Sequence, residues 1–168
     1  MIIEIDGWKF DVDITATMEY SAKEAAEHCD CGYCRNFYAS VYREYPDLRP
    51  FLTQFGVDIE APDELLPYDF PGEMDYDGYY AVCGWILTAG KEPIRIGNAE
   101  IRPERCNDLH LNSGCPEPRF FLNLTGITLP WVLDEPMEDV ISPANEPSFL
   151  KKMWDRLLGG SKKNIPYS

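Results

Sequence analysis

Basic residues are scarce in this 168-residue chain. Lysine and arginine number 15 against 29 aspartates and glutamates, which gives a formal net charge of −14. Nucleic acids and anionic membrane surfaces are bound through lysine and arginine, so we expect neither as a partner. The charge instead favours a basic protein, because opposite charges speed the encounter of two proteins. The alternative is that the acidic surface serves solubility alone.

Long apolar runs are also missing. The sequence has no window close to the roughly 18 apolar residues that a membrane helix needs. The N-terminal residues lack the basic region and apolar run of a secretory signal. We therefore expect a cytoplasmic protein. In that compartment the six cysteines are expected to be thiols or metal ligands rather than disulfides.

Motifs for nucleotide chemistry are absent. The chain contains neither G-x4-G-K-[ST] nor G-x-G-x2-G, the glycine-rich loops that cradle phosphates. Pairs of carboxylates at a spacing suited to hydrolysis can be drawn anywhere among 29 acidic residues. Spacing alone therefore singles out no catalytic pair.

The composition is that of a folded protein with short elements. Hydrophobic residues make up 45% and aromatic residues 13%, which favours a packed interior. We expect a single domain over residues 1–160 and a flexible tail at 161–168. The predicted fold class is α+β: an N-terminal β-hairpin, short helices that carry a cysteine cluster, an antiparallel sheet and a C-terminal amphipathic helix.

Period-two patterns predict the strands. In residues 2–14, two alternating runs flank Asp6-Gly7, a strong hairpin signal. The proline-rich and acidic residues 57–76 are expected to be an ordered loop, closed by a turn at Asp77-Gly78. Trp85 and Trp131 are expected in the core. Further strands are predicted over residues 79–88, 94–101 and 119–129.

Helix signals occur in four places. Ser21-Ala-Lys-Glu24 matches a capping box, which predicts that a helix opens there and is interrupted at Gly32. In the next helix, Phe37 and Val41 should face inward. The last helix has an apolar stripe that includes Phe149, Met153 and Trp154. After the helix that opens at Ser21, the predicted helices span residues 33–45, 48–55 and 148–158.

The segment richest in chemistry is His28-Cys-Asp-Cys-Gly-Tyr-Cys34, with the pattern H-C-x-C-x2-C. Thiolates are soft anionic donors that suit zinc, and clustered thiolates repel one another unless a cation lies between them. We therefore predict a structural zinc site on Cys29, Cys31 and Cys34. The candidates for the fourth ligand are His28, Cys106, His110 and Cys115.

The second histidine lies in another cysteine-containing segment, Cys106-Asn-Asp-Leu-His110-Leu-Asn-Ser-Gly-Cys115. The chain has only two histidines, and each lies beside cysteines. A tetrahedral site joining both segments would tie the N-terminal helices to the β half of the chain. Free structural thiols are the alternative. Cys83, inside a predicted strand, is expected to be a small buried hydrophobic residue.

Cys31-Gly-Tyr-Cys34 also allows a redox interpretation. A thiol at a helix N-terminus has a lowered pKa and becomes a nucleophilic thiolate. The tetrapeptide resembles the active-site motif of thioredoxin-fold disulfide isomerases. This resemblance implies that Cys31 is the nucleophile and Cys34 the resolving thiol. In that family an apolar strand leads into the motif, whereas here the preceding residues 22–28 are polar and helix-prone.

Residues 58–90 contain eight acids and no lysine or arginine. Aromatic residues are interleaved with the acids, as in a docking face for a basic protein. The alternative is a solvated loop whose aromatic residues fold back onto the core. The candidate contact residues are Tyr68, Asp69, Asp75, Tyr76, Asp77 and Tyr79.

Together these features favour a binding protein over an enzyme. We expect an inhibitor or immunity-type partner of a basic protein, with a structural zinc site. The alternatives are a thiol redox enzyme that uses Cys31 and Cys34, and a metal-stapled scaffold within a larger assembly.

Overall fold

Three helices and seven strands make up the part of the chain that the structure describes. The computed structural model describes residues 1–27, 29–70, 73–105 and 113–137, all within the unit Met1–Met137. The predicted helix at 148–158 and the tail at 161–168 lie outside the described residues. The elements are β1 Ile2–Ile5, β2 Trp8–Val12, α1 Ile14–Ala26, α2 Gly32–Glu44, α3 Leu48–Thr53, β3 Glu64–Phe70, β4 Glu73–Thr88, β5 Ile94–Ile96, β6 Ala99–Arg105 and β7 Arg119–Pro130.

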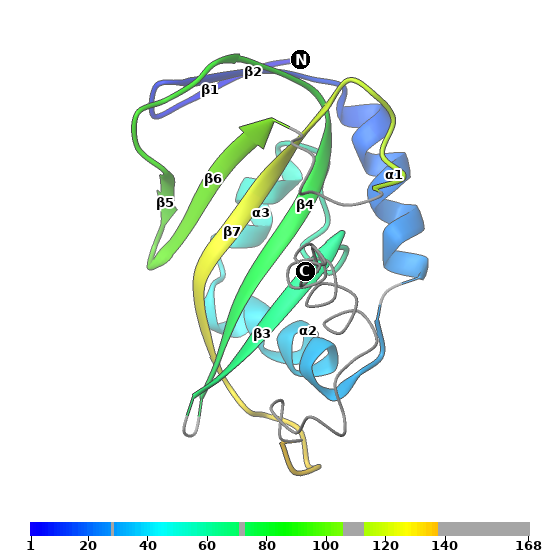
Figure 1. The fold of residues 1–168 in the computed structure, drawn as a ribbon, viewed down its shortest axis with the longest axis vertical. Coiled ribbons are helices and arrows are strands. Elements are labelled where there is room, and N and C mark those ends of the chain that lie inside the picture. The colour runs from blue at the N-terminus through cyan, green and yellow to red at the C-terminus, as the bar shows by residue number, and fades with distance from the viewer. Residues whose placement is uncertain (28, 71–72, 106–112, 138–168) are drawn as a thin grey trace, which may run out of the picture. The chain divides into compact units, whose positions relative to one another are not determined.

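The strands form one antiparallel sheet around the long strand β4 (Figure 1). Its order is β1-β2-β4-β7-β6-β5, and β3 pairs with β4 beside this path. Along one edge β4 pairs with β7, and along the other it pairs first with β3 and then with β2. The predicted α+β class, with an N-terminal hairpin and an antiparallel sheet, is confirmed.

The N-terminal hairpin follows from its turn. Asp6 and Gly7 have φ values of 48° and 82°, both in the left-handed region that a two-residue type I′ turn needs. The turn sets the pairing from Ile2↔Asp11 to Ile5↔Trp8. As a result the apolar side chains of β2 all face the core.

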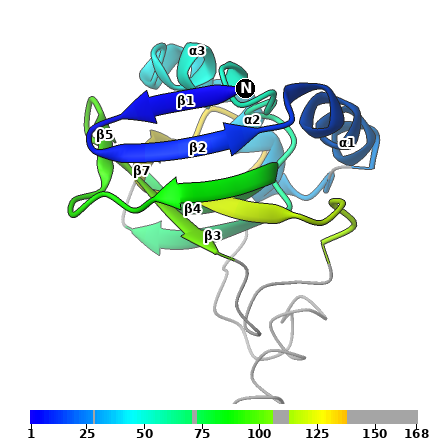
Figure 2. The same ribbon diagram turned by 90° about the horizontal axis from the view of Figure 1, so that it is seen from above.

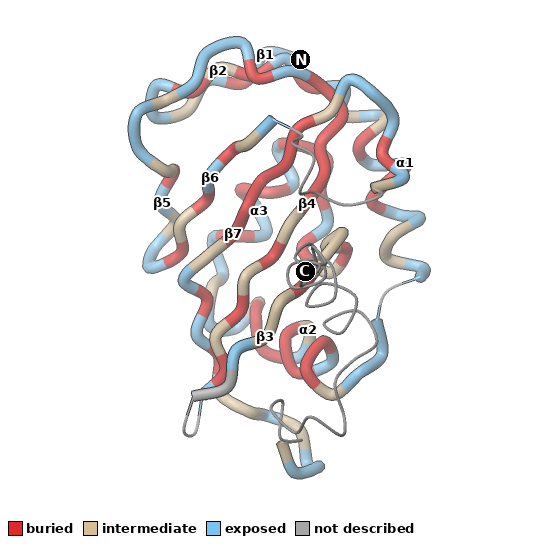
Figure 3. Tube along the Cα trace, viewed as in Figure 1, coloured by how far each residue is buried: buried red, intermediate tan, exposed pale blue. Residues whose placement is uncertain are grey.

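The core lies between the sheet and the helices. Figure 2 shows α2 and α3 over one face of the sheet and α1 at its side, near the end of β2. The Phe10 ring lies 5.3 Å from Phe55 and 5.3 Å from Phe120, measured between ring centroids. Phe37 and Val41 of α2 are fully buried, as predicted. Buried positions accordingly concentrate along β4, β7 and α2 (Figure 3).

Side chains replace a strand where β4 changes its neighbour. Between the start of β3 and the end of β2, the Ala81 amide donates to Asp63 Oδ2 at 2.7 Å and the Cys83 amide donates to Thr17 Oγ1 at 3.0 Å. The Asp13 amide donates to the Cys83 carbonyl at 2.9 Å. Because an unpaired buried amide is costly, these bonds make the switch possible. They also fix α1, the helix that leads to the cysteines.

The start of the first helix differs from the prediction. The helix begins at Ile14, where the Asp13 side chain caps it by accepting a hydrogen bond from the Ala16 amide at 3.0 Å. Ser21 therefore lies inside α1 and caps nothing. Its hydroxyl accepts from the Asp58 amide at 2.9 Å. The Ser21 hydroxyl therefore binds a residue distant in sequence instead of capping a helix.

Two predictions for the acidic segment were wrong. Within the expected loop at 57–76, residues 64–70 and 73–76 are strand, because Glu64–Phe70 pairs with β4 along its whole length. Asp77-Gly78 is not a turn, and both residues lie inside β4. The register shifts between Tyr76 and Gly78, so the irregular residues are accommodated as a bulge.

Two details of the sheet also differ. Trp85 is 60% exposed rather than in the core, because it lies opposite Asp11 on the outer side of β4. The predicted strand at 94–101 is a hairpin of β5 and β6 that turns at Gly97, whose φ is 62°. The strand predicted at 119–129 is confirmed as β7.

Candidate functional site

Cys29, Cys31 and Cys34 form a thiol cluster at the junction of α1 and α2. Their sulfur atoms all lie within 4.8 Å of one another. Cys29 and Cys31 are exposed, whereas Cys34 is buried. Three thiols this close can ligate one cation from one side, so the cluster is able to hold a metal ion.

The start of α2 brings the thiols together. Cys31 is the N-cap residue, with extended backbone angles of φ −73° and ψ 160°. Cys34 follows in the first turn of the helix. The first amides of a helix have no partner within it, so this end of α2 carries a partial positive charge. The sequence thus places one sulfur above a helix N-terminus and a second sulfur beside it.

The cluster contains one acidic thiol. The pKa of Cys31 is lowered to about 5, chiefly by a hydrogen bond from the Cys34 thiol and also by the amides of Cys34 and Tyr33, against the effect of burial. The pKa of Cys34 is raised, because its thiol donates this bond and is buried. Cys31 is therefore the thiolate of the pair at neutral pH. A thiolate can ligate a metal or attack a disulfide.

Asn36 holds α2 against the sheet. Its side chain is fully buried. Nδ2 donates to the Tyr76 hydroxyl and to the Pro130 carbonyl, both at 3.1 Å. Oδ1 accepts from the Val132 amide at 2.8 Å. The Tyr76 hydroxyl donates in turn to the Tyr33 carbonyl at 3.0 Å, so the first turn of α2 is fixed to β4 and to the end of β7.

The segment after β7 packs over the same turn. The Trp131 ring meets the Tyr33 ring edge-on, with centroids 5.9 Å apart. Arg35 forms an ion pair with Glu135. A Cβ atom at Gly32 would lie 3.2 Å from the Glu135 carboxylate and 3.4 Å from the Trp131 ring. Glycine at this position therefore lets the two segments meet closely beside the thiols.

Of the four candidates for a fourth ligand, the structure describes only Cys115. Its sulfur lies 3.2 Å from that of Cys83, and it is not among the thiols that converge at the cluster. His28, Cys106 and His110 lie outside the described residues. Cys83 is buried, as expected for its place in a strand.

A second feature is the sheet face opposite α2 and α3. Within β4, Asp75, Asp77 and Tyr79 alternate with the buried Met74 and Tyr76. The strand register places side chains of β3, β6 and β7 on the same face. We call it the acidic sheet face, and its residues are Glu64, Tyr68, Asp75, Asp77, Tyr79, Glu100 and Glu104.

The charges on this face act on one another. Burial raises the pKa of Asp77, and the negative charge of Asp75 raises it further. Burial also raises the pKa of Tyr79, as do the charges of Asp77, Glu64 and Glu104. These carboxylates are therefore close enough to create a shared negative field. Tyr68 is 44% exposed beside them.

One candidate contact residue falls outside this face, and the side chain of another is not described. Tyr76 is only 1% exposed, so its expected role at a surface is wrong. It lies on the opposite side of β4, where its hydroxyl binds α2. The side chain of Asp69 is outside the described residues. In a strand the side chains of Asp75 and Asp77 lie on one face and that of Tyr76 on the other, a pattern that a loop does not predict.

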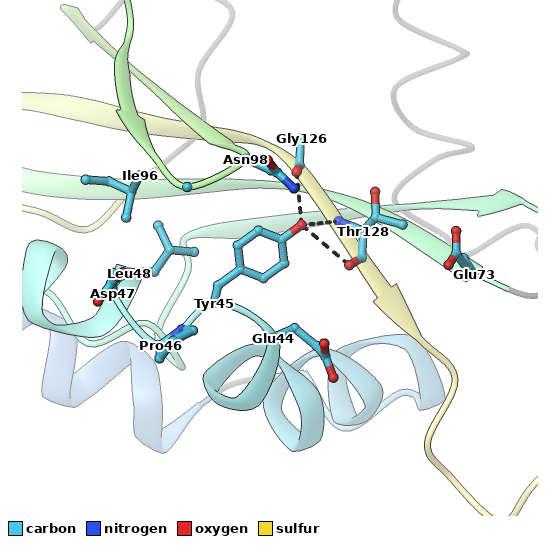
Figure 4. Close-up of a pocket in the computed structure, with 11 residues that line it drawn as sticks. Glu44, Tyr45, Pro46, Asp47, Leu48, Glu73, Ile96, Asn98, Gly126 and Thr128 are labelled. Carbon is cyan, nitrogen blue, oxygen red and sulfur yellow. Dashed lines mark hydrogen bonds between the residues drawn. The ribbon is translucent and has the colours of Figure 1, made fainter.

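A cleft of about 470 Å³ lies between the α2–α3 connection, the β5–β6 turn and the end of β7 (Figure 4). The Tyr45 hydroxyl accepts from the Thr128 amide at 2.9 Å, which completes the edge of β7 beyond the start of β6. The residues that line the cleft come from separate segments, so no sequence motif predicted it. The ionisable groups of its lining, besides Tyr45, are the carboxylates of Glu44, Asp47 and Glu73.

In the described part of the chain, no helix has the length and apolar character needed to cross a membrane. No protein-family model matches the sequence, and comparisons with curated proteins and with solved structures found no match. The thiol cluster and the acidic sheet face are therefore the features of the molecule that bear on its function.

Proposed function

We propose that the chain is a non-catalytic binding protein in which a zinc ion on Cys29, Cys31 and Cys34 fixes the start of α2. The observation that carries the zinc site is the convergence of three sulfur atoms within 4.8 Å. Zn–S bonds of about 2.3 Å in a tetrahedral shell place sulfurs about 3.8 Å apart, so little movement is required. The fourth position is left to His28, Cys106, His110 or water.

Elemental analysis tests the zinc site. The full chain, purified without chelator, is expected to contain one zinc ion. Cys34→Ser should lower the content below about one tenth, whereas Cys83→Ser removes a thiol elsewhere and should leave it unchanged. Zinc-free wild-type protein from zinc-supplemented medium would contradict the proposal, as would full zinc content in the Cys34→Ser variant.

A thiol redox role is the second candidate, and the lowered pKa of Cys31 beside Cys34 supports it. The Cys31 thiolate would attack a substrate disulfide, and Cys34 would then displace the bound half. The substrate would leave as two thiols and Cys31–Cys34 as a disulfide. Against this role, α1 precedes the motif in place of the apolar strand that leads into it in thioredoxin-fold enzymes.

Iodoacetamide labelling separates the two candidates. If zinc occupies the cluster, Cys31 reacts slowly until a chelator removes the metal. A redox pair would instead be zinc-free as purified and would react at once. It would also reduce a model disulfide in an assay that Cys31→Ser abolishes. Absence of zinc, immediate labelling and Cys31-dependent disulfide reduction would together contradict the zinc site and support the redox role.

The acidic sheet face is the proposed binding surface, and its occupant is a basic protein. The observation that supports it is the gathering of five carboxylates from β3, β4 and β6, together with Tyr68 and Tyr79, on one face. The strand register places two cations among them, Arg102 and Arg95, and Arg95 forms an ion pair with Glu100 at 2.5 Å. Lysine and arginine on a partner complement this field, and tyrosines supply contact area.

Two variants with the same net charge, one altered on this face and one altered elsewhere, test the surface. The triple variant Asp75→Asn, Asp77→Asn, Glu104→Gln is compared with a control that neutralises three exposed acids elsewhere: Glu19→Gln, Glu27→Gln and Glu44→Gln. Removing three acids takes both variants from −14 to −11. A basic partner captured from the native cytosol at low salt is identified, purified and titrated against each protein.

The face variant should bind that partner about 10- to 100-fold more weakly, since close interfacial charge pairs contribute more than about 1 kcal/mol each. The control should remain within about twofold of wild type. Equal losses in both variants would attribute binding to net charge and contradict a specific face. Failure to capture a basic partner under these conditions would also count against it.

A further inference from the structure

Cys83 and Cys115 form a pair of thiols separate from the three-cysteine thiol cluster. Cys83 lies in β4, and Cys115 lies in the segment that leads into β7. Their sulfur atoms are 3.2 Å apart, and both residues are buried against Tyr20, Ala81 and Phe121. We propose that Cys83 and Cys115 are a site of reversible disulfide formation.

The backbone of each cysteine is held in place. The Cys83 amide donates to Thr17 Oγ1, and its carbonyl accepts from the Asp13 amide. The Cys115 amide donates to Ser113 Oγ at 3.2 Å, and its carbonyl accepts from Arg119 at 2.6 Å. A disulfide bond is about 2.05 Å long, so the sulfurs must approach by a little over 1 Å. Rotation of two short side chains can supply this movement without displacing β4.

A small oxidant can approach from one side. Cys83 lines a cleft of about 610 Å³ between the start of α1, Trp85 and residues 116–118. The oxidant we name is a low-molecular-weight disulfide such as oxidised glutathione. The Cys83 thiolate attacks one of its sulfurs and releases a thiolate, which takes up a proton. Cys115 then attacks the Cys83 sulfur of the mixed disulfide and releases the second thiol. One small disulfide becomes two thiols, and the protein gains one disulfide.

Burial makes this exchange slow and selective. Burial raises the pKa of Cys115, and its hydrogen bond with Cys83 raises it further. Cys115 is therefore a thiol at neutral pH, and the exchange should quicken as the pH rises. The new bond would join β4 to the segment that contains Ser113. That residue donates to Asp63 at 2.6 Å, so the disulfide would brace the point where β4 changes its neighbour.

The test is redox titration of the full, metal-loaded chain in glutathione buffers. Mass spectrometry should show the loss of two hydrogens, and peptide mapping should find Cys83 linked to Cys115. The melting temperature should rise by about 10 °C on oxidation, as expected for a loop of some 30 residues. The variant Cys31→Ser, Cys34→Ser should still form the bond, which separates this site from the thiol cluster.

Two results would overturn the proposal. One is that both cysteines remain free to alkylate, after denaturation, in fully oxidising buffer. The other is that the linked peptide joins either residue to Cys29, Cys31 or Cys34. Mapping uses the wild-type chain, so the result does not depend on a substitution at either cysteine.

Discussion

Replacing Asn36 with alanine should destabilise the protein by about 2–3 kcal/mol. The fully buried side chain makes three hydrogen bonds, and its loss leaves the Pro130 carbonyl and the Val132 amide without a partner. An orphaned buried group costs about 1–3 kcal/mol, which gives about 2–6 kcal/mol for two. Both groups are only partly buried, so water recovers some of this and the lower end applies. The Tyr76 hydroxyl keeps its bond to the Tyr33 carbonyl.

Urea denaturation followed by tryptophan fluorescence measures this loss as a lower midpoint at constant slope. Asn98→Ala is the matched control, because Asn98 is exposed in the β5–β6 turn and the same substitution should change stability by less than about 0.5 kcal/mol. If Asn36→Ala behaves like this control, Asn36 does not hold α2 to the sheet and the reasoning above is refuted.

Three further predictions concern single positions. Gly84→Ala should unfold the protein or cost at least about 3 kcal/mol, because φ is 147° and a Cβ would strike the backbone of β2. Gly97→Ala, at φ 62° with nothing within 4 Å, should cost only about 1–2 kcal/mol, and equal melting temperatures for the two variants would contradict this. Tyr76→Phe should lose about 1–2 kcal/mol in urea denaturation and Tyr68→Phe almost none, since only the first hydroxyl is buried; the reverse order would show that the faces of β4 are misassigned. After zinc removal, iodoacetamide labelling of Cys31 should rise with a midpoint near pH 5, because the thiolate persists down to the lowered pKa, and a midpoint above pH 8 would refute the hydrogen bond from Cys34.

The sequence predicted elements whose signals are local. The Asp6-Gly7 turn and the spacing of Phe37 and Val41 need only their neighbours, and both predictions were confirmed. The start of α1 was missed because two capping sequences compete, and only the tertiary partner of Ser21 decides between them. The strand β3 was missed because Pro67 interrupts its pattern. Among the described residues β3 pairs with β4 alone, and proline is tolerated in such an edge strand.

The candidate site likewise has a part that local sequence predicts and a part that depends on long-range contacts. The thiols at positions 29, 31 and 34 cluster because they surround a single helix start, and their proximity could be inferred from spacing. The role of Asn36 could not, because its partners lie 40 and 94–96 residues away in sequence. The contact of Cys115 with Cys83 could not be inferred for the same reason, because Cys83 lies 32 residues away in sequence, in β4. The acidic sheet face emerges only once the register is known.

X-ray absorption at the zinc edge of the purified chain tests the central claim most directly. The three sulfurs of the thiol cluster predict a first shell with three Zn–S distances of about 2.3 Å and one further ligand. A first shell made only of nitrogen and oxygen at about 2.0–2.1 Å would show that the metal is held elsewhere, and it would contradict the zinc site at the start of α2.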